Sequence, residues 1–253
     1  SSDLGAARAR NLALNAATGR YVLFLDEELL AGPWLIERHL AVQAAHGGEA
    51  ATVGSVQRHP EMAHHTLTRW YLPEEAPPLV SRETPVSFLD WRAHNLCLPR
   101  KAVLEAGGFD EAFLLPFFDD TDLASRLEAR GMRGVYVPDA RAYVWRTSSF
   151  PLERRRHYAK GYSLHTLRAR TGSPAIYARY RVARNPLLTA VDALVMPLYT
   201  RLCARLNADP SQFGYLYKRV LRYDLYRGYE DARRSRPPRD SFQNTPPPAR
   251  TTV

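Results

Sequence analysis

Cysteines and long apolar runs are scarce in this sequence, which argues against disulfide-stapled and membrane-spanning proteins. The chain of 253 residues contains two cysteines, Cys97 and Cys203, too few for a disulfide framework, so we expect a reducing compartment. No uninterrupted apolar run approaches the ~18–20 residues that a bilayer-spanning helix needs. The sequence begins Ser1-Ser2-Asp3, without a methionine and without a charged segment followed by an apolar one, and we expect a truncated N-terminus.

Charge is distributed unevenly along the chain. Residues 1–150 hold 15 Lys and Arg against 19 Asp and Glu, a net charge of −4. Residues 151–253 hold 20 against 7, a net charge of +13. The basicity of the chain therefore belongs to its C-terminal part. A block of this kind forms a solvated face, or it attracts anionic lipid or nucleic acid.

Hydrophobic periodicity and turn residues predict helices that alternate with strands. We expect helices over 5–17, 34–46, 101–106, from 123 onward, over 185–206 and over 215–234. We expect strands over 21–25, 51–57, 86–91, 95–98, 134–138 and 141–145. Residues 58–85 contain five prolines and are expected to form a variable loop.

A buried strand that ends in three acids organises the sequence. Tyr21–Leu25 is a continuous run of apolar residues, typical of a strand covered on both faces, and Asp26, Glu27 and Glu28 follow it directly. Open α/β sheets bind ligands at the carboxyl ends of their strands. Close carboxylates repel one another, and Mg²⁺ or Mn²⁺ with a diphosphate would relieve that repulsion. The alternative is a solvated acidic turn.

Three further segments accompany this strand in a fixed order. A helix-forming stretch that carries Arg10 and Asn11 precedes it, and Gly107-Gly108-Phe109-Asp110-Glu111 follows it. The third segment is Phe118-Asp119-Asp120-Thr121-Asp122-Leu123, in front of a helix. An acid or threonine at this place is also an ordinary helix cap, which is the structural alternative.

This ordered set resembles the family-2 glycosyltransferases of GT-A fold, over roughly residues 5 to 146. The resemblance implies an α/β, Rossmann-like nucleotide-diphospho-sugar transferase fold, incomplete at the N-terminus, with a C-terminal α-helical extension. Residues 1–150 would be the C-terminal portion of the GT-A domain. Residues 151–234 would be a basic amphipathic helical extension, and residues 235–253, which lack a core-forming pattern, a disordered tail.

The resemblance also implies roles for the acidic and basic residues. Asp120 would be the general base that takes a proton from the acceptor hydroxyl. The other implied roles are donor binding by Arg10, Asn11 and Asp26, metal binding (Mn²⁺ or Mg²⁺) by Asp26 and Glu28, and acceptor-side positions at Asp110 and Asp119. For Asp110, a turn-capping role is the favoured alternative.

The sequence departs from the family pattern at two positions. Glu28 stands where the last Asp of D-x-D is usual, and Trp145 or Arg146 stands near the place of a His that completes the metal site in many relatives. Glu still offers oxygen ligands, but Trp cannot bind a metal. We therefore expect weak metal binding, or charge neutralisation that Arg146 partly takes over.

The C-terminal part carries an apolar stripe at helical spacing over 185–206. The stripe predicts either a helix packed on its neighbours or one that lies at a membrane surface with basic residues near the head groups. No Q-x-x-R-W signature of processive relatives follows Asp120.

We therefore expect an inverting, non-processive transfer of a sugar from a nucleotide-diphosphate donor to a hydroxyl acceptor, lipid-linked or free. By resemblance it would serve polysaccharide, glycolipid or glycoprotein assembly in the cell envelope, in the cytoplasm or peripherally at the inner face of the plasma membrane. An inactive binding or scaffold remnant is the alternative. A nucleic-acid-binding module is disfavoured, because no such motif accompanies the basic residues.

Overall fold

The computed structural model describes residues 5–64, 83–146, 148–180, 186–206 and 210–239. Most of the expected loop 58–85, and residues 240–253 of the expected disordered tail, lie outside these residues. Within the described part of the chain, no helix combines the length and apolarity needed to cross a bilayer.

A mixed six-stranded sheet forms the centre of the first half of the chain. Its hydrogen-bonded order is β1-β5-β3-β6-β2, and β4 pairs with β6 as well. The β3–β6 pair is parallel and the other pairs are antiparallel. The strands are β1 (Tyr21–Leu25), β2 (Leu29–Ala31), β3 (Ala51–Arg58), β4 (Thr84–Val86), β5 (Asn95–Pro99) and β6 (Gly134–Val144).

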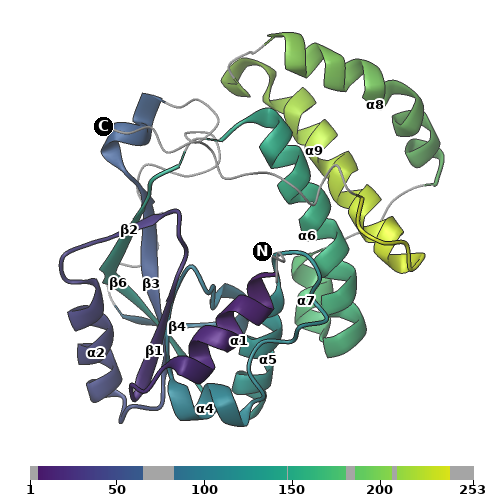
Figure 1. The fold of residues 1–253 in the computed structure, drawn as a ribbon. Coiled ribbons are helices and arrows are strands. Elements are labelled where there is room, and N and C mark those ends of the chain that lie inside the picture. Colours follow the sequence, from purple (N-terminus) through teal and green to yellow (C-terminus); the bar gives the residue numbers. More distant parts are fainter. Residues whose placement is uncertain (1–4, 65–82, 147, 181–185, 207–209, 240–253) are drawn as a thin grey trace.

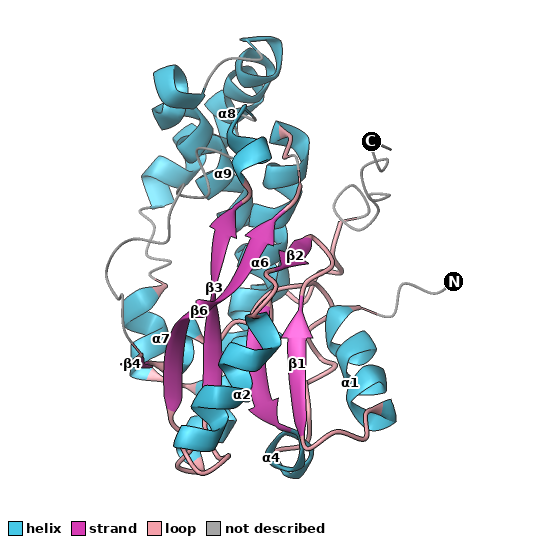
Figure 2. Ribbon diagram, turned by 90° about the vertical axis from the view of Figure 1, so that its left-hand side faces the viewer, coloured by secondary structure: helices cyan, strands magenta, loops and turns pink. Residues whose placement is uncertain are grey.

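Helices cover both faces of this sheet (Figures 1 and 2). One face packs on α2 (Leu35–Ala45), where Val42 joins Val135 and Val137 of β6 in a small apolar cluster. The other face packs on α1 (Ala6–Ala16), α4 (Arg100–Glu105) and α5 (Asp119–Ala129). Because both faces are covered, the strands are rich in buried apolar residues, as expected for the centre of an α/β fold.

The remaining helices stand beside this body (Figure 1). They are α6 (Phe150–Thr171), α7 (Pro174–Arg179), α8 (Pro186–Leu206) and α9 (Pro210–Arg233), and the short 3-10 helices η1 (Pro60–His64) and η2 (Phe88–Asp90) complete the described elements. The hydroxyl of Ser149 caps α6 by accepting a hydrogen bond from the Leu152 N–H, and Gly172 ends it in the left-handed region. Leu164 and Leu167 of α6 belong to the main core, so this helix is docked on the sheet domain.

The predicted strands over 134–138 and 141–145 are wrong as two elements, because β6 is one strand with an irregularity. Its pairing with β3 shifts from Gly54↔Val137 to Ser55↔Arg141. The buried carboxamide of Asn95 donates to the carbonyls of Ser55 (3.1 Å) and Ala140 (2.8 Å). These bonds satisfy the backbone that the bulge leaves unpaired, so the strand continues through it.

Three further expectations differ from the structure. Residues 86–91 are not a strand, because the Ser87 hydroxyl accepts the Leu89 N–H and starts η2, whose Phe88 and Leu89 are buried. The three-residue strand β2 was not expected. The helix expected from Leu123 begins at Asp119, so its acids lie in the first turn rather than at the cap.

Helices α6 and α9 approach each other at two glycines. A Cβ built on Gly161 would overlap the carbonyl oxygen of Leu225, and one built on Gly228 would overlap that of Tyr158. These are backbone atoms that cannot rotate away, so the two helices can pack this closely only where both side chains are absent.

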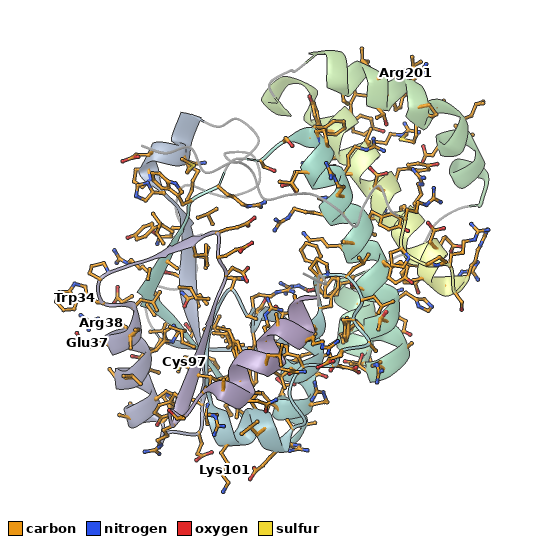
Figure 3. The ribbon with its side chains drawn as sticks, viewed as in Figure 1. Trp34, Glu37, Arg38, Cys97, Lys101 and Arg201 are labelled. Atoms are coloured by element: carbon orange, nitrogen blue, oxygen red, sulfur yellow. The ribbon has the colours of Figure 1, made fainter. Side chains whose placement is uncertain are left out.

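We predict that Gly161→Ala lowers the free energy of unfolding by about 1–3 kcal/mol, because α9 must move to admit the methyl group. A helical Gly→Ala change otherwise stabilises by roughly 0.5–1 kcal/mol, so the expected sign is itself diagnostic. Thermal or urea unfolding measures the change. Lys101→Ala on the exposed face of α4 (Figure 3) is the control, and a stabilised Gly161→Ala variant would contradict the packing described.

Candidate active site

Two backbone pairings fix Asp26, Glu27 and Glu28 at one edge of the sheet, which we call the acidic edge. The antiparallel β1–β5 pair ends at Leu25↔Asn95, and the Asp26 N–H donates to the carbonyl of His94 (3.3 Å). On the other side of the turn, the Trp145 N–H donates to the carbonyl of Glu28 (2.8 Å). Residues 26–28 are therefore fixed between the start of β5 and the end of β6, and the Asp26 side chain, 45% exposed, is accessible to a ligand.

Arg10 of α1 joins the two acidic centres expected from the sequence. Its Nη1 lies 2.5 Å from Asp119 Oδ2, and its Nη2 lies 3.4 Å from Asp26 Oδ1. Burial lowers the pKa of Arg10, but Asp119, Asp120 and Asp26 together raise it above its ordinary value. Arg10 therefore stays charged and holds Asp26 and the start of α5 together, although Asp119 is 109 residues away in sequence.

Asp119 is the buried member of the acidic pair in α5. Its side chain is 3% exposed. Burial raises the pKa of the Asp119 carboxyl and the neighbouring Asp120 raises it further, while the ion pair and hydrogen bond with Arg10 oppose the rise. The buried carboxylate anchors Arg10, and an acceptor-side role of Asp119 stays a prediction.

Asp120 presents its carboxylate from the first turn of α5. Oδ1 accepts the Thr121 N–H (2.7 Å) and Oδ2 accepts the Ala93 N–H (3.1 Å). Arg92 Nη1 lies 3.9 Å from Oδ1. Oδ1 also accepts the Thr121 hydroxyl (3.3 Å), whereas Oδ2 accepts one hydrogen bond and keeps a lone pair for a proton. The arrangement suits a fixed carboxylate base.

The backbone before α5 is strained. Phe117 and Phe118 both have positive φ values, 89° and 69°, which are unusual for bulky residues. Strain of this kind persists only where the surrounding structure fixes it, and it recurs at functional sites. Here Phe118 is buried in the core, and the turn directs the first residues of α5 toward the acidic edge.

Asn11 clamps the segment that contains the paired glycines. Its carboxamide donates to the Phe109 carbonyl and accepts the Phe109 N–H, both at 2.8 Å, and donates to Glu111 (3.0 Å). Gly108 has φ 68°, and a Cβ there would lie 2.7 Å from Asn11 Oδ1. The carboxamide is thus engaged within the protein, and a direct role of Asn11 in donor binding stays a prediction.

Asp110 and Asp122 make hydrogen bonds and ion pairs within the protein. Asp110 accepts the Ala112 N–H (2.9 Å) and pairs with Arg170 (2.7 Å), which agrees with the capping alternative. Asp122 pairs with Arg126 (2.8 Å), which in turn donates to the carbonyl of Gly108 (2.8 Å). An acceptor-side role of Asp110 stays a prediction.

Sequence reasoning missed His94 and Arg92. Burial lowers the pKa of the His94 imidazole, and the charges of Arg92 and Arg10 lower it further. Asp120 and Asp26, which both lie near the ring, oppose this decrease, and the ring is neutral. Arg92 donates to Tyr180 Oη (2.6 Å) and Thr121 Oγ1 (3.3 Å). A histidine and an arginine before a strand form no recognisable motif, and only the β1–β5 register places His94 beside Asp26.

Glu28 is already occupied by cations. Its Oε2 lies 3.0 Å from Arg146 Nε, and its Oε1 lies 3.5 Å from Arg156 Nη1. Among the residues that the structure describes, no three His, Cys, Asp or Glu side chains gather into a group that could hold a metal ion. Both oxygens of Glu28 are therefore engaged by guanidinium groups, and the role of Asp26 and Glu28 as metal ligands stays a prediction.

The chain is similar to two curated glucosyltransferases. Validoxylamine A glucosyltransferases from Streptomyces hygroscopicus subsp. jinggangensis and subsp. limoneus are each 31% identical to the chain over 199 residues. The alignments cover 64% of this chain but only 46% and 43% of those proteins, so the chain spans about half the length of these curated relatives.

A solved structure and a family model give the fold and the family. The mannosyltransferase PcManGT from Pyrobaculum calidifontis, solved in complex with GDP-Man and Mn²⁺, aligns with a TM-score of 0.53 at 16% identity, over 90% of this chain and 66% of that one. The predicted α/β fold of the GT-A type is thereby confirmed. Residues 2–163 match the model described as glycosyltransferase like family 2, and the chain belongs to that family.

Proposed function

We propose that this chain transfers a sugar from a nucleotide-diphosphate donor to a hydroxyl acceptor, one sugar at a time and with inversion at the anomeric carbon. The observation that carries the proposal is the placement of Asp120. Its carboxylate is fixed by two backbone N–H groups, and 13% of its side chain is exposed. Arg10 joins Asp26 of the acidic edge to Asp119, the residue before Asp120. A base needs this combination of fixed geometry and access.

The reaction balances with Asp120 as the proton acceptor. The acceptor oxygen attacks the anomeric carbon while its proton passes to the Asp120 carboxylate. The bond between the anomeric carbon and the phosphate oxygen breaks, and its electron pair leaves with the nucleoside diphosphate. Attack from the side opposite to the leaving group inverts the configuration. No step is assigned to a metal ion, since two guanidinium groups already hold Glu28.

The relatives suggest which substrates to test first. The curated relatives are named glucosyltransferases that act on validoxylamine A, and the solved neighbour holds GDP-Man. Glucosyl and mannosyl nucleotides are therefore the first donors, and polyhydroxylated small molecules and lipid-linked glycans the first acceptors. A role in cell-envelope polysaccharide, glycolipid or glycoprotein assembly is part of this proposal.

We predict that Asp120→Asn lowers the transfer rate by about 10²–10⁴-fold, because the amide cannot accept the acceptor proton. Initial rates of nucleoside diphosphate release measure the change, and cooperative thermal unfolding establishes that the variant is folded. Asp139→Asn, an exposed carboxylate on β6, is the matched control. A variant with more than about a tenth of the original rate would remove Asp120 from the role of base.

We predict that a sugar nucleotide stabilises the chain and that Asp26→Asn weakens this effect. At a ligand concentration of 100 times Kd, a ligand that binds only the folded state stabilises by about 2.7 kcal/mol. That corresponds to a rise in Tm of roughly 5–10 °C for a domain of this size. Thermal scans with glucose and mannose esters of UDP and GDP, in buffer with Mn²⁺, measure it.

Glu37→Gln, at the exposed start of α2, is the control for charge loss in this measurement (Figure 3). An equal decrease in both variants would show a general charge effect rather than a donor contact of Asp26.

Helix α8 exposes an apolar stripe that suits a membrane surface. Val191, Leu194, Leu198 and Leu202 recur at three- and four-residue spacing, and Leu194 and Leu198 are 82% and 66% exposed. The other side of α8 packs on α9 through Met196 and Cys203. We propose anionic lipid as the partner of the stripe, because residues 151–253 carry a net charge of +13 and Arg201 lies on the outer side of this helix (Figure 3).

We predict that the double variant Leu194→Ser, Leu198→Ser binds vesicles that contain phosphatidylserine at least about tenfold more weakly, since each leucine contributes roughly 1.5–3 kcal/mol when buried. Co-sedimentation measures the partition. Ile36→Ser, an equally exposed apolar residue on α2, is the control. Equal binding to neutral vesicles, unaffected by salt, would disprove the lipid assignment.

A further inference from the structure

Four basic side chains lie opposite the acidic edge, and we call Arg92, Arg146, Arg156 and Lys160 the cation cluster. They come from three places: the segment before β5, the end of β6 and the second and third turns of α6. Arg156 and Lys160 share the ring of Phe117, at 5.6 Å and 5.2 Å from its centroid. Phe117 thus fixes two cations of α6 at one spot near Glu28.

The members of the cation cluster repel one another. Burial lowers the pKa of the Lys160 ammonium to about 8. The nearby charges of Arg156, Arg92 and Arg146 lower it as well, and Glu153 opposes this decrease. Among the described residues, no carboxylate lies at ion-pair distance from the ammonium of Lys160. An anion placed among these groups would relieve their repulsion.

The positive charges that favour an anion beside Glu28 disfavour a divalent cation there. To bind Glu28 it would have to displace the guanidinium groups of Arg146 and Arg156 from both carboxylate oxygens. It would also lie beside two fixed positive charges in a half-buried site. Arg146 itself has little freedom to move away, because its side chain is 13% exposed and a second carboxylate, that of Glu153, lies 3.8 Å from its Nη2.

We infer that the cation cluster binds the diphosphate of the donor directly, in place of a divalent cation held by Asp26 and Glu28. The inference rests on the proposed function. When the bond to the anomeric carbon breaks, its electron pair adds one negative charge to the terminal phosphate of the leaving group. Guanidinium and ammonium groups donate charge-assisted hydrogen bonds to phosphate oxygens, and they stabilise this charge best where it develops.

The test uses inorganic pyrophosphate as the probe. Isothermal titration of the full chain in buffer with EDTA is expected to show binding without metal. Arg156→Gln and Lys160→Gln are each expected to weaken it about tenfold or more, as for loss of one charge-assisted hydrogen bond. Arg38→Gln on α2 and Lys101→Gln on α4 remove the same charges far from the site (Figure 3) and should leave the affinity unchanged.

Glu28→Gln separates the two mechanisms most sharply. If Glu28 bound a metal that holds the diphosphate, its loss would weaken pyrophosphate binding. If the cation cluster binds the diphosphate, the variant removes a competing carboxylate from Arg146 and Arg156, and the affinity in EDTA is retained or increased.

Three results would overturn the inference: pyrophosphate binding that requires Mn²⁺, no pyrophosphate binding with or without Mn²⁺, or equal weakening by the control variants. The proposed function is tested by a different variant. Asp120→Asn should lower the rate of sugar transfer by about 10²–10⁴-fold and leave pyrophosphate binding in EDTA intact. Transfer that survives in Asp120→Asn therefore contradicts the proposed base alone, whereas metal-dependent pyrophosphate binding contradicts the cation cluster alone.

Discussion

The site depends on the neutralisation of several carboxylates that the fold gathers at one edge of the sheet. Left alone, they would repel one another strongly in a half-buried position. The structure assigns a cation to each of them, and most of these cations come from distant parts of the sequence. The pairs are Arg10 with Asp119 and Asp26, Arg92 with Asp120, and Arg146 and Arg156 with Glu28. Each pair therefore also docks one element on another.

Burial divides these acids into a covered and an accessible group. Asp119 is almost completely covered and pairs at 2.5 Å, so removal of Arg10 would leave a buried charge, which typically costs about 3–5 kcal/mol. Asp120 and Asp26 keep accessible surface and have looser cation contacts, 3.9 Å and 3.4 Å. Neighbours in sequence thus differ in exposure, because the first turn of α5 points one carboxylate inward and the next toward the edge.

Local sequence patterns predicted most helices and strands well, but they predicted the side-chain contacts between these elements poorly. The strand Tyr21–Leu25 and the helices α1, α2 and α8 follow from apolar periodicity, and they are confirmed within a few residues. The continuous β6 was missed because its bulge is stabilised by Asn95, a side chain 45 residues before Ala140 in the sequence. His94 was missed for the same reason. Register and long-range side-chain bonds arise only when strands pair, so no local pattern encodes them.

The two departures from the family pattern form a single feature of the structure. Read separately, a Glu in place of Asp and an Arg near the place of a His look like two losses from a metal site. The β2–β6 pairing sets Leu29 opposite Val144 and so brings Glu28 and Arg146 together, at 3.0 Å. The guanidinium supplies positive charge at the carboxylate that would otherwise need a metal ion. A glutamate, with its longer side chain, can satisfy Arg146 and Arg156 at once, one through each oxygen. The pair is therefore better explained as an alternative way to hold positive charge at this edge than as a damaged metal site.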